Sequence, residues 1–338
     1  METKEILQKI CAAPGVSGAE HTTATVIKEL VSEFTDDITT DALGNLIAVV
    51  NPQGEKGMML FAHMDKIGLV VTGIDRESGF LRIFPAGGVD ARTASAQRVR
   101  VYGTETREGV IISTPPHLSN EKKAVPVDEL TVDCGLPYET ISKIVFPGCR
   151  AELRNGFYEL KNGICCSEFI DNAAGCAVTL KALEYLKGKA ENTRLECVFS
   201  TREEVGKGGA LTAAFRSRAE DALVFDVSFA SAPGVPAERC APLGSGAMIG
   251  CSPILQKDAF DLCVQTAKEE NLPFTVEISG RSTGTDADVA VTAGAGKRTA
   301  LISVPLKNMH TPVETVDIRD IEVCARLAAA YVERRNGQ

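Results

Sequence analysis

The sequence predicts an α/β protein built as a three-layer sandwich, with a mostly parallel central sheet and a small β-rich insert. Two observations support this fold class. From residue 171 onward, strand-like and helix-like segments alternate, which implies a mostly parallel sheet covered on both faces. Residues 67–161 break the alternation with short β segments and little helix, which indicates a small domain inserted between two parts of the larger one.

The N-terminal part supplies two helices and two strands. Residues 1–15 form a predicted charged amphipathic helix, and residues 19–34 place apolar side chains such as Val26 and Leu30 at helical spacing. The apolar runs GNLIAVV and GMMLFAHMD follow and are typical of strands.

The insert and the C-terminal part complete the predicted order of elements. The insert holds five β segments, at 69–74, 80–84, 98–103, 108–113 and 129–135. The C-terminal part alternates helices at 173–188, 209–218, 257–271, 286–293 and 318–335 with strands at 194–200, 222–227, 274–279 and 299–304. A chain of 338 residues exceeds what one hydrophobic core usually serves, which agrees with two domains.

The composition excludes several kinds of partner. A net charge of -9 argues against nucleic acid or an anionic membrane, because both require clustered Lys and Arg. No apolar run approaches the ~18 residues of a transmembrane helix, and the N-terminus lacks a signal peptide's apolar core. The 11 cysteines form no CxxC pair, which is typical of buried free thiols in a reducing cytoplasm.

Polar side chains gather at the carboxyl ends of the predicted strands, where open α/β sheets form their sites. The candidates are His63, Asp65, Asp171, Glu203, Glu204, Asp226 and His310. The chain has only 4 histidines, and two of them are in this set. The others, His21 and His117, lie in a polar helix start and a Pro-rich loop and are expected at the surface.

Several of these residues have a purely structural alternative. Asp171 and Asp226 suit the cap of a following helix or turn, and His310 suits an ordinary loop before a proline. His63 fits such an alternative less well. Asp65 is two positions further along, hence on the same face of a strand, and resembles the carboxylate that supports a metal-binding imidazole.

Taken together, two imidazoles and three carboxylates suit a centre of two zinc ions, with one carboxylate bridging them. Glu203 and Glu204 repel each other at the end of a buried strand, but two nearby cations make the pair favourable. One glutamate can then bind metal while its neighbour takes a proton from water as general base.

Five motifs in order resemble the M42 family of metallo-aminopeptidases. They are FAHMDKIG, FIDNAAG, STREEVGKGGA, VFDV and KNMHTPVETVD. The family includes the glutamyl and tetrahedral (TET) aminopeptidases and members once labelled endoglucanases. The resemblance covers nearly the whole chain, including APGVSGAE near the start and STGTDAD near the end.

The resemblance implies a role for each candidate residue. His63 and Asp226 would hold one divalent metal ion, Glu204 and His310 a second, and Asp171 would bridge them. The ions would be zinc, with cobalt and manganese as alternatives. Glu203 would be the general base, and Asp65 would orient His63.

The resemblance also implies the domain organisation and assembly. Residues 1–66 and 162–338 would form a zinc-peptidase-like catalytic domain, and residues 67–161 a β-barrel dimerisation domain. Dimers would assemble into a tetrahedral dodecamer whose inner chamber admits only short peptides.

The chain departs from the family's usual residues close to the site. Asn172 and Ala173 follow the bridging aspartate where the family has other residues, Lys66 replaces an acid, and Cys149 replaces an aspartate near the end of the insert. Because every implied ligand and the base are present, we expect catalysis.

The substrate pocket and the reaction leave alternatives open. The loop SGRSTGTDAD is expected to line the pocket with Thr285 and Asp286, or else to be a turn with Asp286 near a helix cap. Lys66 or Arg281 would be able to bind an acidic substrate side chain. Alternative functions are a dinuclear deacetylase or carboxypeptidase, or a catalytically silent metal-binding scaffold. A glycosidase is disfavoured, because 5% aromatics and no Trp provide no sugar-stacking platform.

Overall fold

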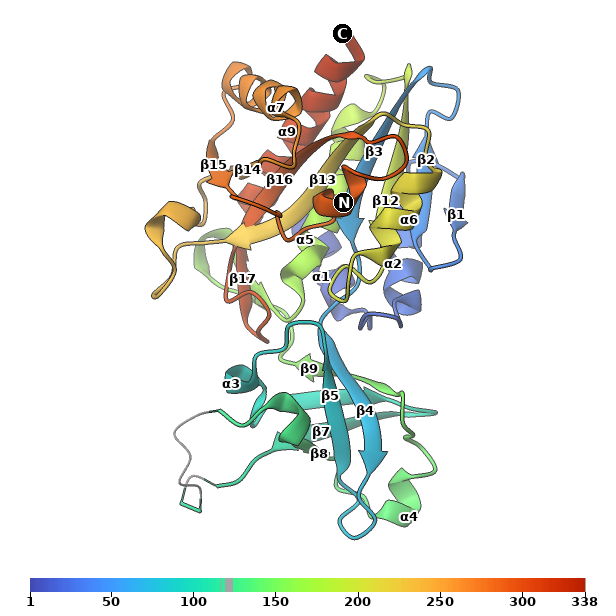
Figure 1. The fold of residues 1–338 in the computed structure, drawn as a ribbon, viewed down its shortest axis with the longest axis vertical. Helices are drawn as coiled ribbons and strands as arrows, with labels where there is room; N and C mark the ends of the chain where they lie inside the picture. Colours follow the sequence, from blue (N-terminus) through green and yellow to red (C-terminus); the bar gives the residue numbers. More distant parts are fainter. Residues whose placement is uncertain (116, 119–123, 338) are drawn as a thin grey trace.

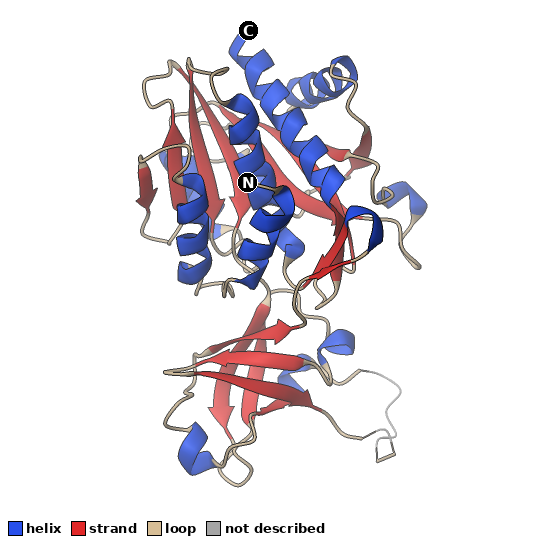
Figure 2. Cartoon of the chain, turned by 180° about the vertical axis from the view of Figure 1, so that it is seen from behind, coloured by secondary structure: helices blue, strands red, loops and turns tan. Residues whose placement is uncertain are grey.

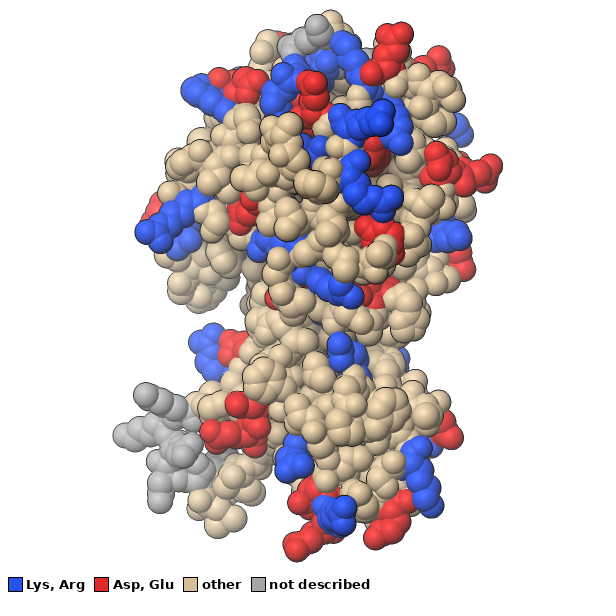
Figure 3. All heavy atoms as spheres, turned by 45° about the vertical axis from the view of Figure 1, so that its right-hand side comes forward, with Lys and Arg blue, Asp and Glu red and all other residues tan. Residues whose placement is uncertain are grey.

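The computed structural model describes residues 1–115, 117–118 and 124–337. It contains a large α/β unit and a smaller β-barrel, which lies at one end of the large unit (Figure 1). This arrangement confirms the predicted fold class. No helix in the described part of the chain is long and apolar enough to cross a membrane. Acidic and basic side chains lie interspersed over the face seen in Figure 3.

The large unit is built on an 11-stranded mixed sheet. Its strands, in spatial order, are β1 (Ile38–Thr40), β2 (Leu46–Val50), β12 (Thr193–Ser200), β3 (Lys56–His63), β13 (Asp221–Phe229), β16 (Arg298–Lys307), β17 (Glu314–Asp317), β11 (Ile164–Ser167) and β10 (Tyr158–Glu159). Strand β14 (Ala247–Cys251) pairs with β16 and with β15 (Phe274–Ile278). The four central strands β12, β3, β13 and β16 are parallel, and the outer pairings are antiparallel except for β14 with β15.

Helices cover both faces of this sheet, as a buried parallel centre requires. One face packs against α1 (Thr3–Ala12), α2 (His21–Val31), α5 (Ile170–Leu186), α7 (Lys257–Glu269) and α9 (Ile318–Gly337). Figure 2 shows helices of this layer lying across the sheet. The other face packs against α6 (Gly208–Arg216) and the short α8 (Ala287–Ala290).

The alternation of side chains along β3 shows which face carries the candidate site. Leu60 and Ala62 pack in the core on the α5 side, whereas Met59 and Phe61 pack beneath α6 and α8. His63 continues the second series, because side chains two positions apart point the same way. The site therefore lies on the thinly covered face, beyond the ends of the short helices.

The inserted β segments close into a barrel. Its strands, in spatial order, are β4 (Gly68–Ile74), β5 (Leu81–Ala86), β8 (Thr131–Asp133), β7 (Thr106–Ile112), β6 (Arg98–Tyr102) and β9 (Arg150–Arg154). Two short helices, α3 (Ala91–Ala94) and α4 (Tyr138–Ile141), flank it. Cys149, one of the departures from the family pattern, is buried in the barrel core.

Some boundaries differ from the sequence prediction. Strand β10 hydrogen-bonds to β11 in the large sheet, so we propose a domain boundary between β9 and β10, before residue 161. Strand β13 does not end at Asp226 but continues to Phe229. The helix expected at 286–293 is only α8, which ends at Ala290.

Candidate metal centre

The register of the central strands brings the predicted site residues to one level. Ser200, the last residue of β12, pairs with His63, the last residue of β3. Val224 of β13 pairs with Phe61, so Asp226, two residues further, lies at the level of His63. Asp226 is buried, and on β13 it lies two residues beyond Val224, where the pairing with β3 ends.

Five side chains from five different segments form two overlapping groups of possible metal ligands. His63, Asp171 and Asp226 form one group, and Asp171, Glu204 and His310 form the other. His63 Nε2 lies 3.2 Å from Asp171 Oδ1, and His310 Nε2 lies 3.4 Å from Asp171 Oδ2. Asp171 thus offers one oxygen to each group.

The remaining distances in the two groups are short as well. His63 Nε2 is 3.8 Å from Asp226 Oδ1, and His310 Nε2 is 3.3 Å from Glu204 Oε1. Asp171 is not the N-cap of α5, because Phe169 occupies that position and Asp171 lies in the first turn.

The carboxylates of the cluster outnumber its two histidines, and this imbalance shifts the pKa values of both kinds of group. Burial lowers the pKa of His310, but hydrogen bonds to Asp171 and Glu204 outweigh it and raise the value to about 11. Burial likewise opposes protonation of His63, yet the adjacent carboxylates, Asp171 first, raise its pKa well above the usual value. Burial raises the pKa of Asp226 to about 7 against the opposing effect of His63.

These residues fit divalent cations. Within the described residues, Asp171 Oδ1 is buried and receives no hydrogen bond, although His63 Nε2 is nearby. A buried carboxylate oxygen without a donor is costly unless a cation occupies the position. Imidazole nitrogens combined with carboxylate oxygens suit zinc and similar ions, which would take the place of the protons held by the two histidines.

Asp65 connects the first imidazole to the glutamate pair. It is fully buried, and its Oδ1 lies 3.5 Å from His63 Nδ1. The same carboxylate accepts hydrogen bonds from the backbone N–H groups of Glu203 (2.9 Å) and Glu204 (3.2 Å), and from the Ser17 hydroxyl (2.6 Å). Asp65 therefore positions the glutamate pair as well as His63.

Glu203 lies beside the cluster but belongs to neither ligand group. Its side chain is buried, and its Oε1 lies 3.1 Å from Lys207 Nζ. The two adjacent glutamates thus face different partners, Glu204 the imidazole of His310 and Glu203 the ammonium of Lys207.

Two supports of the second histidine were not anticipated from the sequence. Glu314, at the start of β17, is buried and accepts hydrogen bonds from the backbone N–H groups of Asp171 (2.9 Å) and His310 (2.7 Å). From the barrel loop, the carbonyl of Gly88 lies 3.2 Å from His310 Nδ1, which leaves Nε2 to face the carboxylates. An acid four residues after His310 was the available signal for Glu314, whereas a backbone carbonyl leaves none in the sequence.

Replacing Glu314 with glutamine will weaken cation binding by about 10- to 100-fold, because the amide loses one of two acceptors that orient ligand segments. Zinc affinity by chelator competition measures the effect. Glu139→Gln, at an exposed glutamate on the barrel, is the matched control. Unchanged zinc affinity in the Glu314 variant would show that it does not position the ligands.

Two departures from the family pattern have structural roles. The Asn172 side chain accepts a hydrogen bond from Gly175 N–H and donates one to the Phe225 carbonyl, which ties the start of α5 to β13 beside Asp226. Lys66 is buried and turned away from the site. Its ammonium donates to backbone carbonyls at the end of α1, including those of Ile10 and Cys11, where a cation is favourable.

A cavity of about 450 Å³ opens beside the ligands. Thr285 lines it, as the sequence suggested. Asp286 is not among its lining residues: it is buried, accepts a hydrogen bond from Ser200 Oγ, and burial raises its pKa well above the usual value. Lys66 and Arg281 are not among its lining residues either.

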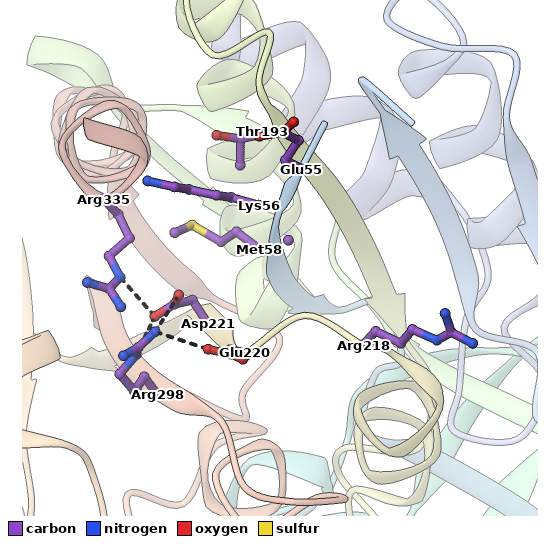
Figure 4. A pocket seen from close by; sticks show the side chains of 10 residues that line it. Glu55, Lys56, Met58, Thr193, Arg218, Glu220, Asp221, Arg298 and Arg335 are labelled. Atoms are coloured by element: carbon purple, nitrogen blue, oxygen red, sulfur yellow. Dashed lines mark hydrogen bonds and ion pairs between the residues drawn. The ribbon is translucent and has the colours of Figure 1, made fainter. Parts of the chain in front are cut away.

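A second cavity of about 420 Å³ lies at the opposite, amino-terminal edge of the central strands (Figure 4). It is lined by residues that begin strands, such as Lys56, Asp221 and Arg298. Asp221 accepts hydrogen bonds from both Arg298 and Arg335, so these charges neutralise one another. The two histidines that were predicted to lie at the surface are exposed: His21 at the start of α2 and His117 in the insert.

Comparisons with known proteins agree with this geometry. A family model described as M42 glutamyl aminopeptidase matches residues 44–327. The chain is 34% identical to a lysyl aminopeptidase of Pyrococcus furiosus, over 97% of this chain and 96% of that protein. It is 34% identical to a protein of Acetivibrio thermocellus named a putative aminopeptidase, over 96% of each.

Solved structures show the same fold. An aminopeptidase from the archaeon Desulfurococcus kamchatkensis superposes with a TM-score of 0.91 at 31% identity, covering 98% of this chain and 94% of that one. The TET1 peptidase of Pyrococcus horikoshii, described as assembling into a tetrahedron or a large octahedral shell, has a TM-score of 0.86 at 30% identity. That match covers 97% of this chain and 98% of the other. The chain therefore belongs to the M42 glutamyl aminopeptidase family and is a metal-dependent aminopeptidase, an enzyme that hydrolyses peptide bonds.

Proposed function

We propose that this enzyme uses two divalent cations to remove single residues from the N-terminus of short peptides, with Glu203 as general base. The observation that carries the proposal is the position of Asp171, whose two oxygens face the two imidazoles of separate ligand groups. Glu203, which lies in neither group, supports the second half of the proposal.

In this proposal each residue of the site has its own role. His63 and Asp226 hold one cation, Glu204 and His310 the other, and Asp171 is shared. The cations, when bound, polarise the scissile carbonyl and make water a stronger acid. The Glu203 carboxylate accepts the proton of the attacking water and then gives it to the leaving amine nitrogen. Asp65 keeps the Glu203 backbone in place through its hydrogen bond to the N–H group.

Zinc is the proposed metal, with cobalt and manganese as alternatives, because all three accept mixed nitrogen and oxygen ligands. We also propose a homo-oligomer, in which the barrel mediates dimers that assemble into a tetrahedral dodecamer. The tetrahedral assembly of the TET1 peptidase supports this. A cytoplasmic location is supported by the 11 cysteines, all of which are free thiols.

The test is hydrolysis of leucine p-nitroanilide, with its α-amino group free or acetylated, by protein stripped with EDTA and reloaded with zinc. We expect cleavage of the free compound only, loss of activity on stripping and recovery on reloading. Equal cleavage of the acetylated compound would contradict an aminopeptidase and favour the related deacetylase or carboxypeptidase. Light scattering after gel filtration measures the assembly, and a monomer would contradict the proposed oligomer.

A further inference from the structure

The cavity beside the metal centre is lined in part by an acid that the proposed reaction does not use. Glu277, on strand β15, lines the same cavity as the metal ligands. Its carboxylate accepts a hydrogen bond from the hydroxyl of Ser228. Ser228 follows Asp226 by two positions on β13, so both side chains point to the same face, roughly 6.5 Å apart along the strand.

Glu277 differs from the other acids of the cavity in having no cationic partner there. The carboxylates of Asp171, Glu204 and Asp226 belong to the ligand groups, and Glu203 pairs with Lys207. Glu277 makes no ion pair with any residue that the structure describes. Arg239, a cation that lowers its pKa, is exposed and does not line the cavity.

The environment of Glu277 favours a cation brought by the substrate. Burial raises the pKa of the Glu277 carboxyl, against the opposing effect of the hydroxyls of Ser228 and Ser303. A half-buried carboxylate without a counter-charge is unfavourable, and a cation placed beside it removes that cost. The Ser228 hydroxyl donates to the carboxylate and orients it, so a cation would meet an ordered acceptor.

The cavity walls fit an amphipathic side chain. Phe229 and Met309, both partly exposed, are among the residues that line the cavity together with Glu277. Apolar residues beside a carboxylate match the methylene stem and charged head of lysine or arginine. A four-carbon stem with its ammonium spans roughly 6 Å, comparable with the roughly 6.5 Å along β13 from Asp226 to Ser228, the residue that donates to Glu277.

Lys207 brings a positive charge to the same cavity. It also lines the cavity, and it would attract an acidic substrate side chain if it were unpaired. However, its ammonium pairs with Glu203, and Asp286 and Asp288 also raise its pKa. Lys207 is therefore already neutralised by its own acids.

We propose that Glu277 selects peptides whose first residue is basic, lysine or arginine, by pairing with the cationic end of that side chain. The proposal rests on the aminopeptidase function proposed above and names its substrate class.

Binding gives the first test, independent of turnover. The peptides Lys-Ala-Ala and norleucyl-Ala-Ala differ in the ammonium group, and each is titrated calorimetrically into zinc-loaded Glu203→Gln protein. We expect the lysyl peptide to bind at least about tenfold more tightly, as for a hydrogen bond to a charged group. In the Glu203→Gln/Glu277→Gln double variant this ratio should fall to about one, since glutamine keeps the bond to Ser228 but not the charge.

Hydrolysis gives the second test and separates the two proposals. The wild type, Glu277→Gln and the control Glu139→Gln are compared on lysine, norleucine and glutamate p-nitroanilides. We expect Glu277→Gln to lose kcat/KM on the lysine compound by about tenfold or more and to retain it on norleucine. Equal preference in the wild type, or an equal loss on both compounds, would overturn the selective role of Glu277. Failure to cleave any of the three would instead contradict the aminopeptidase proposal.

Discussion

Replacing Glu203 with glutamine will reduce kcat by up to about 10⁴-fold while the protein still binds two cations. Glutamine has nearly the same shape but cannot accept the proton of the attacking water. The backbone N–H of residue 203 would still donate to Asp65, so the neighbouring segment should keep its position. The rate on leucine p-nitroanilide and the zinc content by mass spectrometry are measured together.

The control for this variant is Glu139→Gln, an exposed glutamate of the barrel that should leave both quantities unchanged. A Glu203 variant that retains most of its turnover would show that another group accepts the proton. A variant that loses zinc in proportion to activity would instead place Glu203 among the ligands, which its absence from both ligand groups argues against.

Replacing Asp171 with asparagine will weaken the binding of both cations, by at least about 100-fold. Asp171 is the only residue shared by the two ligand groups found among the described residues. Asparagine keeps one carbonyl oxygen but removes the negative charge and the second oxygen. Zinc stoichiometry and affinity, measured by competition with a chromogenic chelator, report the loss.

Asp226→Asn is the informative comparison for that experiment. Asp226 belongs to only one group, so its variant should lose affinity for one cation and keep the other. If Asp171→Asn also weakens only one cation, the carboxylate is not shared and the proposed bridge is wrong. If neither variant changes zinc affinity, the cluster does not hold the metal.

Much of the fold follows from local pattern. The apolar runs at 57–62 and 222–225 predicted strands from their composition alone. In the structure these strands are buried on both faces, as continuous apolar runs in a parallel sheet are expected to be. The insert was visible because helical periodicity disappears between residues 67 and 161. The sequence predicted the ends of strands and helices less well. Asp226 was expected at a strand end, although β13 continues to Phe229.

The seven predicted site residues could be named because each is an acid or histidine at the end of an apolar strand or the start of a helix. Their assignment to two metals came from resemblance to a family, and that assignment stays a proposal. Thr285 was expected at the cavity and lines it, whereas Asp286, from the same loop, is buried behind it. Adjacent residues on a loop can point in opposite directions, which spacing alone does not reveal.

The sequence by itself determined the family, the α/β class with its insert, and the type of chemistry, because chemically distinctive side chains follow recognisable strands. Only the tertiary structure showed that Gly88 of the barrel supports His310 and that Glu314 holds the backbones of two ligands. It also showed that Lys66 points toward α1 and that Glu277 lines the cavity. Apart from the contact between Glu314 and His310, these contacts join segments far apart in the chain, and they depend on how strands register and pack, which local periodicity does not specify.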